Sequence, residues 1–183
     1  CSKHITALLQ SRGCDAMGLA GCDASLIKAS RRAPRLLSDG KTTLDYGLIG
    51  DVKPESVNAE ALLKLIDSGI VPVFCAISHD GRGELLNTNA DTIASAISAA
   101  INAELLYCFE KNGVLYSLND PDSVIPSLDL GAYTRLKEEG RVAQGMIPKL
   151  DNAFSALRAG AASVRILHSE SLLDGDAGTK LTL

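Results

Sequence analysis

Two short stretches carry residues with clear chemical potential, and each stands at the start of a predicted helix. Residues 87–91 read Asn-Thr-Asn-Ala-Asp, and residues 145–149 read Gly-Met-Ile-Pro-Lys. Because Pro148 is typical of the first helical position, Lys149 falls in the first turn, where a cation is disfavoured by roughly 0.3–1 kcal/mol. An anion bound at the same helix end would explain this lysine, and phosphate is commonly bound there. The pattern therefore indicates an ATP-dependent phosphotransferase.

The same residues also have plain structural interpretations. Asp91 in a first turn is stabilised in its ionised form, which suits capping, or the orientation of lysine ammonium groups, better than acid–base catalysis. Asn87 and Asn89 either bind a small substrate through neutral donors and acceptors or only shape a turn. Since helix N-termini and strand C-terminal ends share one edge of an α/β sheet, both stretches can face one crevice.

Strand-like and helix-like patterns alternate along the chain. Strands are predicted at residues 15–20, 25–30, 46–52, 70–77, 104–109, 163–167 and 179–183. Helices are predicted at residues 1–13, 57–68, 90–101, 130–139 and 148–159. The apolar run 70–77 is typical of a strand buried on both faces of a parallel sheet. The alternation predicts an α/β fold with helices on both faces of a mainly parallel central sheet, a three-layer sandwich.

Composition excludes several classes of protein. The net charge of −4 over 183 residues argues against general nucleic-acid binding. No apolar run is long enough to span a bilayer. The five cysteines form no Cys-x-x-Cys pair and no histidines have metal-ligand spacing, so we expect free thiols in a reducing cytoplasm and no metal site. Gly40-Lys41-Thr42 resembles the end of a P-loop, but Arg35 replaces the required glycine, and residues 31–41 read as an exposed excursion.

The order of the motifs resembles that of the amino acid kinase family, and within it the N-acetylglutamate kinase branch. The segments that carry the resemblance are 18–23, 45–52, 71–73, 87–91, 110–115, 145–149 and 178–179. Residues 107–111, Tyr-Cys-Phe-Glu-Lys, are similar to the sequence found at this place in family members of the Bacteroides group. The resemblance covers nearly the whole chain.

This resemblance implies transfer of the ATP γ-phosphoryl group to the side-chain carboxylate of an N-acyl-L-glutamate, acetyl or succinyl, in arginine biosynthesis, with Mg²⁺ on the phosphates. It implies that Lys149 stabilises the transferring phosphoryl group, that Asp91 organises the catalytic lysines, and that Asn87 and Asn89 bind substrate. The implied nucleotide-binding residues are Glu110, Lys111, Asn112, Gly113, Val114, Leu115, Arg141, Val142, Ala143, Gly145 and Met146.

It further implies that residues 1–88 are the remainder of an acyl-amino-acid-binding half and residues 89–183 a nucleotide-binding half. A cytoplasmic homodimer or higher homo-oligomer is expected, acting on small molecules without membrane or nucleic acid.

The chain departs from the family pattern at several positions. Glu110 stands where aspartate is usual, and Cys22 and Ala24 replace a common lysine and glycine. The family's Lys-x-Gly-Gly loop, Gly-Gly-Gly segment and substrate-binding arginine are not found, and their place would be upstream of Cys1, which opens inside a predicted helix. We therefore expect a partial chain whose 183 residues alone are inactive.

Two other functions stay open from the sequence. One is a family member with a different acceptor, such as carbamate, aspartate, glutamate or a nucleoside monophosphate. The other is a non-catalytic regulator that binds a nucleotide or an amino acid on the same fold.

Overall fold

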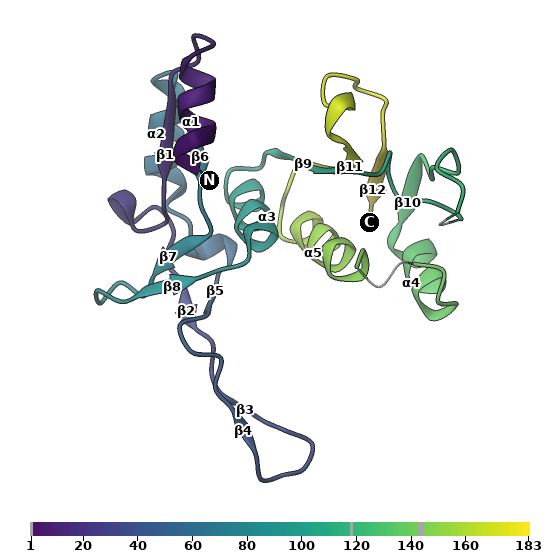
Figure 1. Cartoon of the computed structure of the whole chain (residues 1–183), viewed down its shortest axis with the longest axis horizontal. Coiled ribbons are helices and arrows are strands. Elements are labelled where there is room, and N and C mark those ends of the chain that lie inside the picture. Colours follow the sequence, from purple (N-terminus) through teal and green to yellow (C-terminus); the bar gives the residue numbers. More distant parts are fainter. Residues whose placement is uncertain (1, 118, 143–144) are drawn as a thin grey trace. The chain divides into compact units, whose positions relative to one another are not determined.

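The computed structural model describes residues 2–117, 119–142 and 145–183, and its chain forms two compact units, Cys1–Ala96 and Ile97–Leu183 (Figure 1). Both units combine helices with β-strands, as the predicted α/β class requires. The boundary predicted between residues 88 and 89 concerned binding roles, and those roles stay a prediction.

In the first unit, helices pack on a parallel pair of strands. Strand β1 (Ala16–Leu19) pairs with β6 (Val71–Phe74), α1 (Ser2–Gln10) packs on both, and α2 (Ala59–Asp67) packs on β6. Three antiparallel pairs follow: β2 (Ser30–Arg31) with β5 (Gly50–Asp51), β3 (Arg35–Leu36) with β4 (Thr43–Leu44), and β7 (Ile77–His79) with β8 (Leu85–Asn87). Helix α3 (Ala90–Ala100) begins directly after this last pair.

Two predicted strands of this unit are wrong in extent. The run 70–77 is divided into β6 and β7, and Val71 is exposed rather than buried on both faces. Pro72 lacks the backbone N–H that a central strand needs, which agrees with the pairing of β6 to β1 alone among the described residues. The predicted strand 46–52 shrinks to β5 because Asp45 accepts a hydrogen bond from the backbone N–H of Gly47 and turns the chain.

The predicted strand 25–30 is also wrong in extent, because Ile27 and Lys28 form only isolated bridges and Ser30 alone belongs to a strand, β2. The first residue of the predicted strand ends a short 3-10 turn, η1 (Asp23–Ser25), in which Ala24 and Ser25 have φ values of 48° and 51°. Asp23 accepts a hydrogen bond from the Ala20 N–H at 2.7 Å, and this local contact closes the turn in place of a strand. The following Leu26 and Ile27 are buried, so their apolar character reflects the core rather than a regular ladder.

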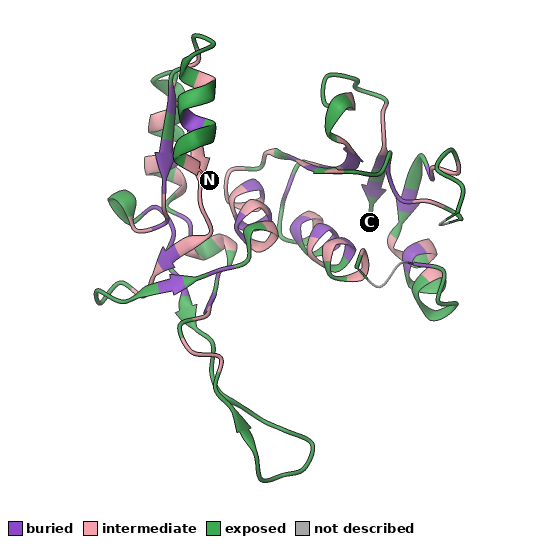
Figure 2. Ribbon diagram, in the orientation of Figure 1, coloured by how far each residue is buried: buried purple, intermediate pink, exposed green. Residues whose placement is uncertain are grey.

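A segment that we call the arm, residues 31–45, is exposed throughout and contains the β3–β4 hairpin (Figure 2). The predicted exposed excursion is thus confirmed. Its turn is organised by Asp39, which accepts hydrogen bonds from the hydroxyl of Thr42 and from the backbone N–H groups of Lys41 and Thr42. These hydrogen bonds, the hydroxyl first, lower the pKa of Asp39 to about 2. The Gly-Lys-Thr sequence is therefore part of a hairpin turn and not of a P-loop.

The second unit is built on a four-stranded sheet with the order β10–β12–β11–β9. Its strands are β9 (Glu104–Phe109), β10 (Ser127–Asp129), β11 (Ser163–His168) and β12 (Thr179–Thr182). Strands β9 and β11 are parallel, as are β10 and β12, whereas β11 and β12 are antiparallel. The mainly parallel arrangement matches the prediction, and β10, which no periodicity indicated, is an addition.

Two helices complete the second unit. Helix α4 (Leu130–Glu138) packs on β10, and α5 (Ile147–Arg158) packs on β11 and β12. The inner face of α5 buries Leu150, Ala153, Phe154 and Ala156 against the sheet. Because β9 and β11 end side by side, with Phe109 opposite His168, and β12 begins near the same edge, the sheet presents one edge on which a ligand site can be built.

Candidate active site

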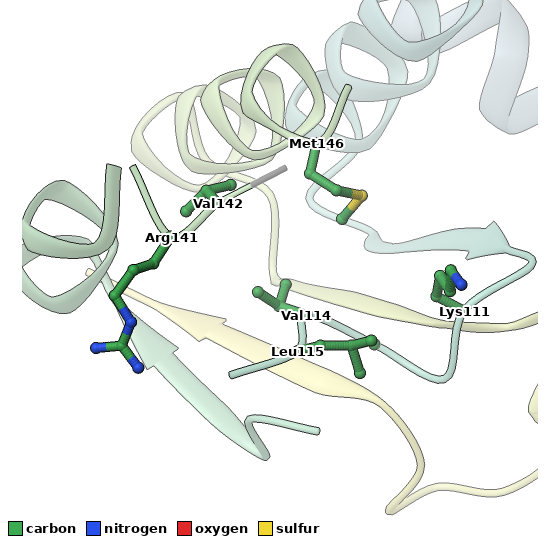
Figure 3. A pocket seen from close by; sticks show the side chains of 7 residues that line it. Lys111, Val114, Leu115, Arg141, Val142 and Met146 are labelled. Carbon is green, nitrogen blue, oxygen red and sulfur yellow. The ribbon is translucent and has the colours of Figure 1, made fainter. Parts of the chain in front are cut away.

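An apolar cavity of about 110 Å³, the inner cavity, lies in the second unit (Figure 3). Two segments about thirty residues apart supply its walls: Lys111, Gly113, Val114, Leu115, Arg141, Val142 and Met146. In Figure 3, Val142 and Met146 lie across the cavity from Val114 and Leu115. Aliphatic walls of this kind suit the flat face of a purine ring better than a charged group.

A larger and more polar cavity of about 480 Å³, the outer cavity, adjoins it through the shared residues Lys111 and Met146. Its walls are Cys108, Phe109, Glu110, Lys111, Met146, His168 and Ser169. All of them except Met146, the N-cap of α5, lie at or directly after the adjacent ends of β9 and β11, which explains why segments far apart in sequence meet. The mixture of charged and polar side chains suits a polyanion more than an apolar group.

The turn at Gly113 is held by the start of β12. The backbone N–H of Val114 donates to the Thr179 Oγ1 at 2.8 Å, and Thr179 is fully buried. A Cβ at position 113 would lie 2.8 Å from that same oxygen, so only glycine fits this approach. Gly178 is also restricted, because its φ of 86° and the nearby Ile166 carbonyl leave no room for a side chain. Thr179 is therefore a positioning residue for the inner cavity.

A polar network joins α4 to α5 and consists of the buried Tyr133 with the exposed side chains of Lys137 and Asp151. The Tyr133 hydroxyl donates to Asp151 at 2.7 Å, Lys137 Nζ donates to both oxygens of Asp151 at 2.9 Å, and the Tyr133 ring stacks on Phe154. Burial, followed by the hydrogen bond to Asp151, raises the pKa of Tyr133 to about 12. Burial opposes ionisation of Asp151, but the hydrogen bonds from Lys137 and Tyr133 outweigh it and lower the pKa of that carboxyl. The network fixes α5, and with it the position of its first turn.

Lys149 lies in the first turn of α5, as predicted, and its side chain is half-buried. The N-cap residue Met146 supplies no side-chain hydrogen bond, and the first turn contains no acidic residue. Lys149 Nζ lies 4.3 Å from the centre of the Phe109 ring, and Phe109 lines the outer cavity. A cation and a helix N-terminus with no side-chain cap are thus both next to the more polar of the two cavities.

The first unit contains a separate cavity of about 300 Å³, the first-unit cavity. It is lined by Arg32, Ile49, Gly50, Asp51, Asn87, Thr88, Asn89 and Thr92. Asn89 caps α3 by accepting a hydrogen bond from the Thr92 N–H at 3.1 Å. Both predicted substrate-binding asparagines thus line one cavity, and their amide groups add no charge to it.

Asp91 lies in the first turn of α3, as predicted, and is half-buried. It belongs to the first unit, whereas Lys149 belongs to the second. That both residues act on one phosphate stays a prediction.

Most of the predicted nucleotide-binding residues that the structure describes line the inner or the outer cavity. Asn112 and Gly145 line neither, and Ala143 lies outside the described residues. Phe109, His168 and Thr179 were not among the predicted site residues, because their place depends on the register of β9, β11 and β12. Arg32 was missed as well, since it sits in a stretch that reads as a plain basic loop.

Residues 2–117, 119–142 and 145–183 contain no group of three or more histidine, cysteine, aspartate or glutamate side chains arranged to hold a metal ion. No helix within these residues combines the length and the apolar character that a membrane crossing requires.

Comparison with known proteins agrees with the motifs and the fold. The family model described as "Amino acid kinase family" matches residues 1–168. Acetylglutamate kinase from Cytophaga hutchinsonii is 45% identical, covering 98% of this chain and 69% of the relative. Acetylglutamate kinase from Bacteroides thetaiotaomicron is 43% identical, covering 98% of this chain and 68% of the relative.

Among solved structures, that of smu.665 from Streptococcus mutans UA159 superposes with a TM-score of 0.76 at 24% identity, covering 98% of this chain and 66% of that one. A likeness at this identity shows the fold alone. The match of the family model over most of the chain, together with relatives above 40% identity, shows that this chain belongs to the amino acid kinase family.

Proposed function

We propose that this protein transfers the γ-phosphoryl group of ATP to the side-chain carboxylate of an N-acyl-L-glutamate, as a kinase of arginine biosynthesis. One observation carries this proposal. Lys111, Val114 and Leu115 meet Arg141, Val142 and Met146 around an apolar cavity, and Lys149 stands beside the polar cavity that adjoins it. The relatives named acetylglutamate kinase support the acceptor class.

In this proposal the adenine ring occupies the inner cavity and the phosphates extend into the outer cavity, toward the first turn of α5. Both reactants are anions, so the protein must supply fixed positive charge where they meet. Lys149 and the backbone N–H groups at the start of α5 provide it. Lys111 adds a second cation at the point where the two cavities join.

The reaction needs no general base. The acceptor carboxylate is already ionised near neutral pH, because a glutamate side chain has a pKa near 4.3. One of its oxygens attacks the γ-phosphorus, the bond from that phosphorus to the β,γ-bridging oxygen breaks, and ADP leaves with the electron pair. An acyl phosphate is the product. Asp91 then serves as a fixed charge that orients lysine ammonium groups rather than as a proton acceptor.

Magnesium enters this proposal with the nucleotide. Mg²⁺ usually keeps several waters and binds substrate phosphates with few protein ligands, so it does not require a cluster of carboxylates from the chain. We also propose a cytoplasmic homo-oligomer, as the family resemblance implies.

The acceptor cavity in this proposal is the first-unit cavity. Asn87 and Asn89 offer it amide donors and acceptors without net charge, which suits the amide bond of an N-acylated amino acid. A free α-amino group would instead call for a carboxylate partner, and the carboxylate of this cavity, Asp51, is already paired with Arg32.

An acceptor panel tests the proposal. The complete gene product is mixed with MgATP and N-acetylglutamate, N-succinylglutamate, glutamate, aspartate, carbamate or uridine monophosphate, and ADP release is measured. Hydroxylamine converts an acyl phosphate into a stable hydroxamate, so the product is identified directly. We expect hydroxamate from the N-acylglutamates. Turnover restricted to another acceptor would assign a different branch of the family, and absence of turnover with all six would favour the non-catalytic regulator.

A further inference from the structure

The first-unit cavity contains a cation that the proposed phosphoryl transfer leaves without a role. Of the described residues that line it, Arg32 alone is positively charged, and its side chain is 43% exposed. The neighbouring Arg31 does not line the cavity. It donates from Nε to the Gly47 carbonyl at 3.1 Å and lies within ion-pair distance of Asp45 and Glu84. Arg31 therefore anchors the base of the arm, and Arg32 is available for another purpose.

The guanidinium of Arg32 is held on one edge and open on another. Its Nε donates to the two carboxylate oxygens of Asp51 at 3.1 and 3.2 Å, and Nη2 contacts the same carboxylate. The centre of the Tyr46 ring lies 5.4 Å from Cζ, within the range of a cation–π contact. In the described parts of the chain, Nη1 has no hydrogen-bond partner. The Nη1–Nη2 edge thus remains as a fork suited to a second carboxylate.

Resting on the kinase function proposed above, we infer that Arg32 is a specificity-determining residue that binds a non-reacting carboxylate of the N-acylglutamate. The side-chain carboxylate must stay free to attack phosphorus, so it is not the partner. Every N-acylglutamate keeps its α-carboxylate, and an acidic acyl chain carries a further one. Asp51 weakens the net attraction for an anion but holds the guanidinium in place, so less order has to be gained when the substrate binds.

The competing structural role is that the Arg32–Asp51 pair only joins β2 to β5 at the base of the arm. If the pair is only structural, its loss lowers the stability of the protein and changes KM by the same factor for every substrate. If Arg32 binds substrate, its loss changes KM by a factor that depends on which carboxylates the substrate carries. Steady-state kinetics of the complete gene product therefore separate the two. The variants are Arg32→Gln, which removes the charge, and Arg32→Lys, which keeps the charge without the fork. The matched control is Arg35→Gln, on the exposed strand β3 and away from the cavity.

Three substrates show which carboxylate is bound: N-acetylglutamate, its α-amide and N-succinylglutamate. We expect Arg32→Gln to raise KM for N-acetylglutamate about 10- to 100-fold with kcat nearly unchanged, because a charged hydrogen-bonded contact is lost. If the α-carboxylate is the partner, the variant and the wild type have equal KM for the α-amide. If the acyl carboxylate is the partner, the increase occurs with N-succinylglutamate alone.

Arg32→Lys should recover part of the affinity and serves as the test if Arg32→Gln fails to fold, which thermal unfolding reveals. Equal KM values for wild type and Arg32 variants with all three substrates would overturn the role of Arg32 while leaving the kinase function intact. Failure of the wild type to phosphorylate any N-acylglutamate would instead overturn the proposed function itself.

Discussion

The cavities of the two units differ in how their walls are held. The inner cavity of the second unit depends on buried groups: Thr179 is fully buried and holds the Val114 N–H, and Gly113 packs directly against it. Most of the polar side chains that line the first-unit cavity are exposed, namely Arg32, Asp51, Asn87 and Asn89. Because exposed ion pairs contribute little to folding, changes in the first-unit cavity should affect binding alone, whereas changes at the inner cavity should affect stability and binding together.

Lys149 differs from the buried groups of the second unit, because it is half-buried at a helix end, and its replacement should therefore affect activity without affecting stability. We predict that Lys149→Ala lowers kcat about 100- to 1,000-fold, the range seen when one transition-state donor is removed. Stability should barely change, because a lysine in a first turn opposes the helix dipole. Steady-state kinetics and thermal unfolding measure both quantities. Lys64→Ala, which removes an exposed lysine from α2, is the control and should be inert.

A weak effect of Lys149→Ala on kcat would remove Lys149 from the reaction and leave the outer cavity without its proposed catalytic cation.

The coupling of stability and binding at the inner cavity is tested by Thr179→Val. The variant keeps the shape of the side chain but leaves the Val114 N–H buried without an acceptor, which costs about 1–3 kcal/mol. We expect denaturant unfolding to show this loss and KM for ATP to rise, because the turn at Gly113 loses its support. Thr182→Val, on the exposed face of the same strand, should change neither quantity. If Thr179→Val lowers stability without changing KM for ATP, this turn does not shape the nucleotide site.

The network between α4 and α5 gives a pH-dependent test. Tyr133 keeps its proton in the folded state up to a pKa of about 12, whereas an unfolded tyrosine ionises near pH 10. Between these values the unfolded state binds fewer protons, so stability falls as pH rises. Tyr133→Phe should cost about 1 kcal/mol at pH 8, from the lost hydrogen bond to Asp151, and its deficit should shrink by pH 11.

Urea unfolding at the two pH values measures this change, and Tyr116→Phe, at an exposed tyrosine, is the control. A deficit that stays constant from pH 8 to pH 11 would mean that Tyr133 does not titrate as its burial and its hydrogen bond to Asp151 require.

The sequence predicted regular elements well where local chemistry decides them. The strand at 104–109 matches β9 at both ends, and Pro148 correctly indicated that Lys149 lies in a first turn. The three-residue strands β8 and β10 were not predicted, because they are too short to show an alternation of apolar and polar residues. The division of the run 70–77 into two strands was not predicted, because apolar side chains indicate burial and do not indicate whether the hydrogen bonding of a strand continues.

The candidate site was predicted in part, and its prediction came from the family resemblance rather than from local sequence patterns. Residues 110–115 were connected with Arg141, Val142 and Met146 only through the family resemblance, since nothing in their spacing indicates that they meet. The roles of Thr179 and Phe109 follow from strand register, and that of Arg32 from the direction of one side chain at the base of the arm. Such information is created by tertiary pairing, so local sequence patterns do not contain it.

On the first-unit side, Asn87→Ala should affect binding alone. Loss of a neutral hydrogen bond predicts a rise of about 2- to 12-fold in KM for the N-acylglutamate, with unchanged KM for ATP and unchanged stability. The comparison residue is Asn58, which caps α2 by accepting from the Ala61 N–H at 3.2 Å. Asn58→Ala should do the reverse, losing about 1 kcal/mol of stability with no effect on KM. A stability loss for Asn87→Ala equal to that of Asn58→Ala would mean that Asn87 is a turn residue.

The smallest expected effect is at Ala24, the position where the family resemblance expects glycine. Its φ of 48° lies in the left-handed region, and the following Ser25 shares this conformation. A left-handed backbone costs an L-residue about 1–2 kcal/mol, while glycine adds about 0.5–1 kcal/mol of unfolded-state entropy, so Ala24→Gly should stabilise the protein by about 0.5–1 kcal/mol. Ala61→Gly, inside α2, should destabilise it by about 1 kcal/mol.

Because Ala24 does not line the first-unit cavity, kinetic constants should stay constant while denaturant midpoints move in opposite directions for the two variants. If both variants instead moved the denaturant midpoint in the same direction, the turn at Ala24 would carry no strain. The stability of this unit would then be set by helix propensity rather than by backbone conformation near its loops.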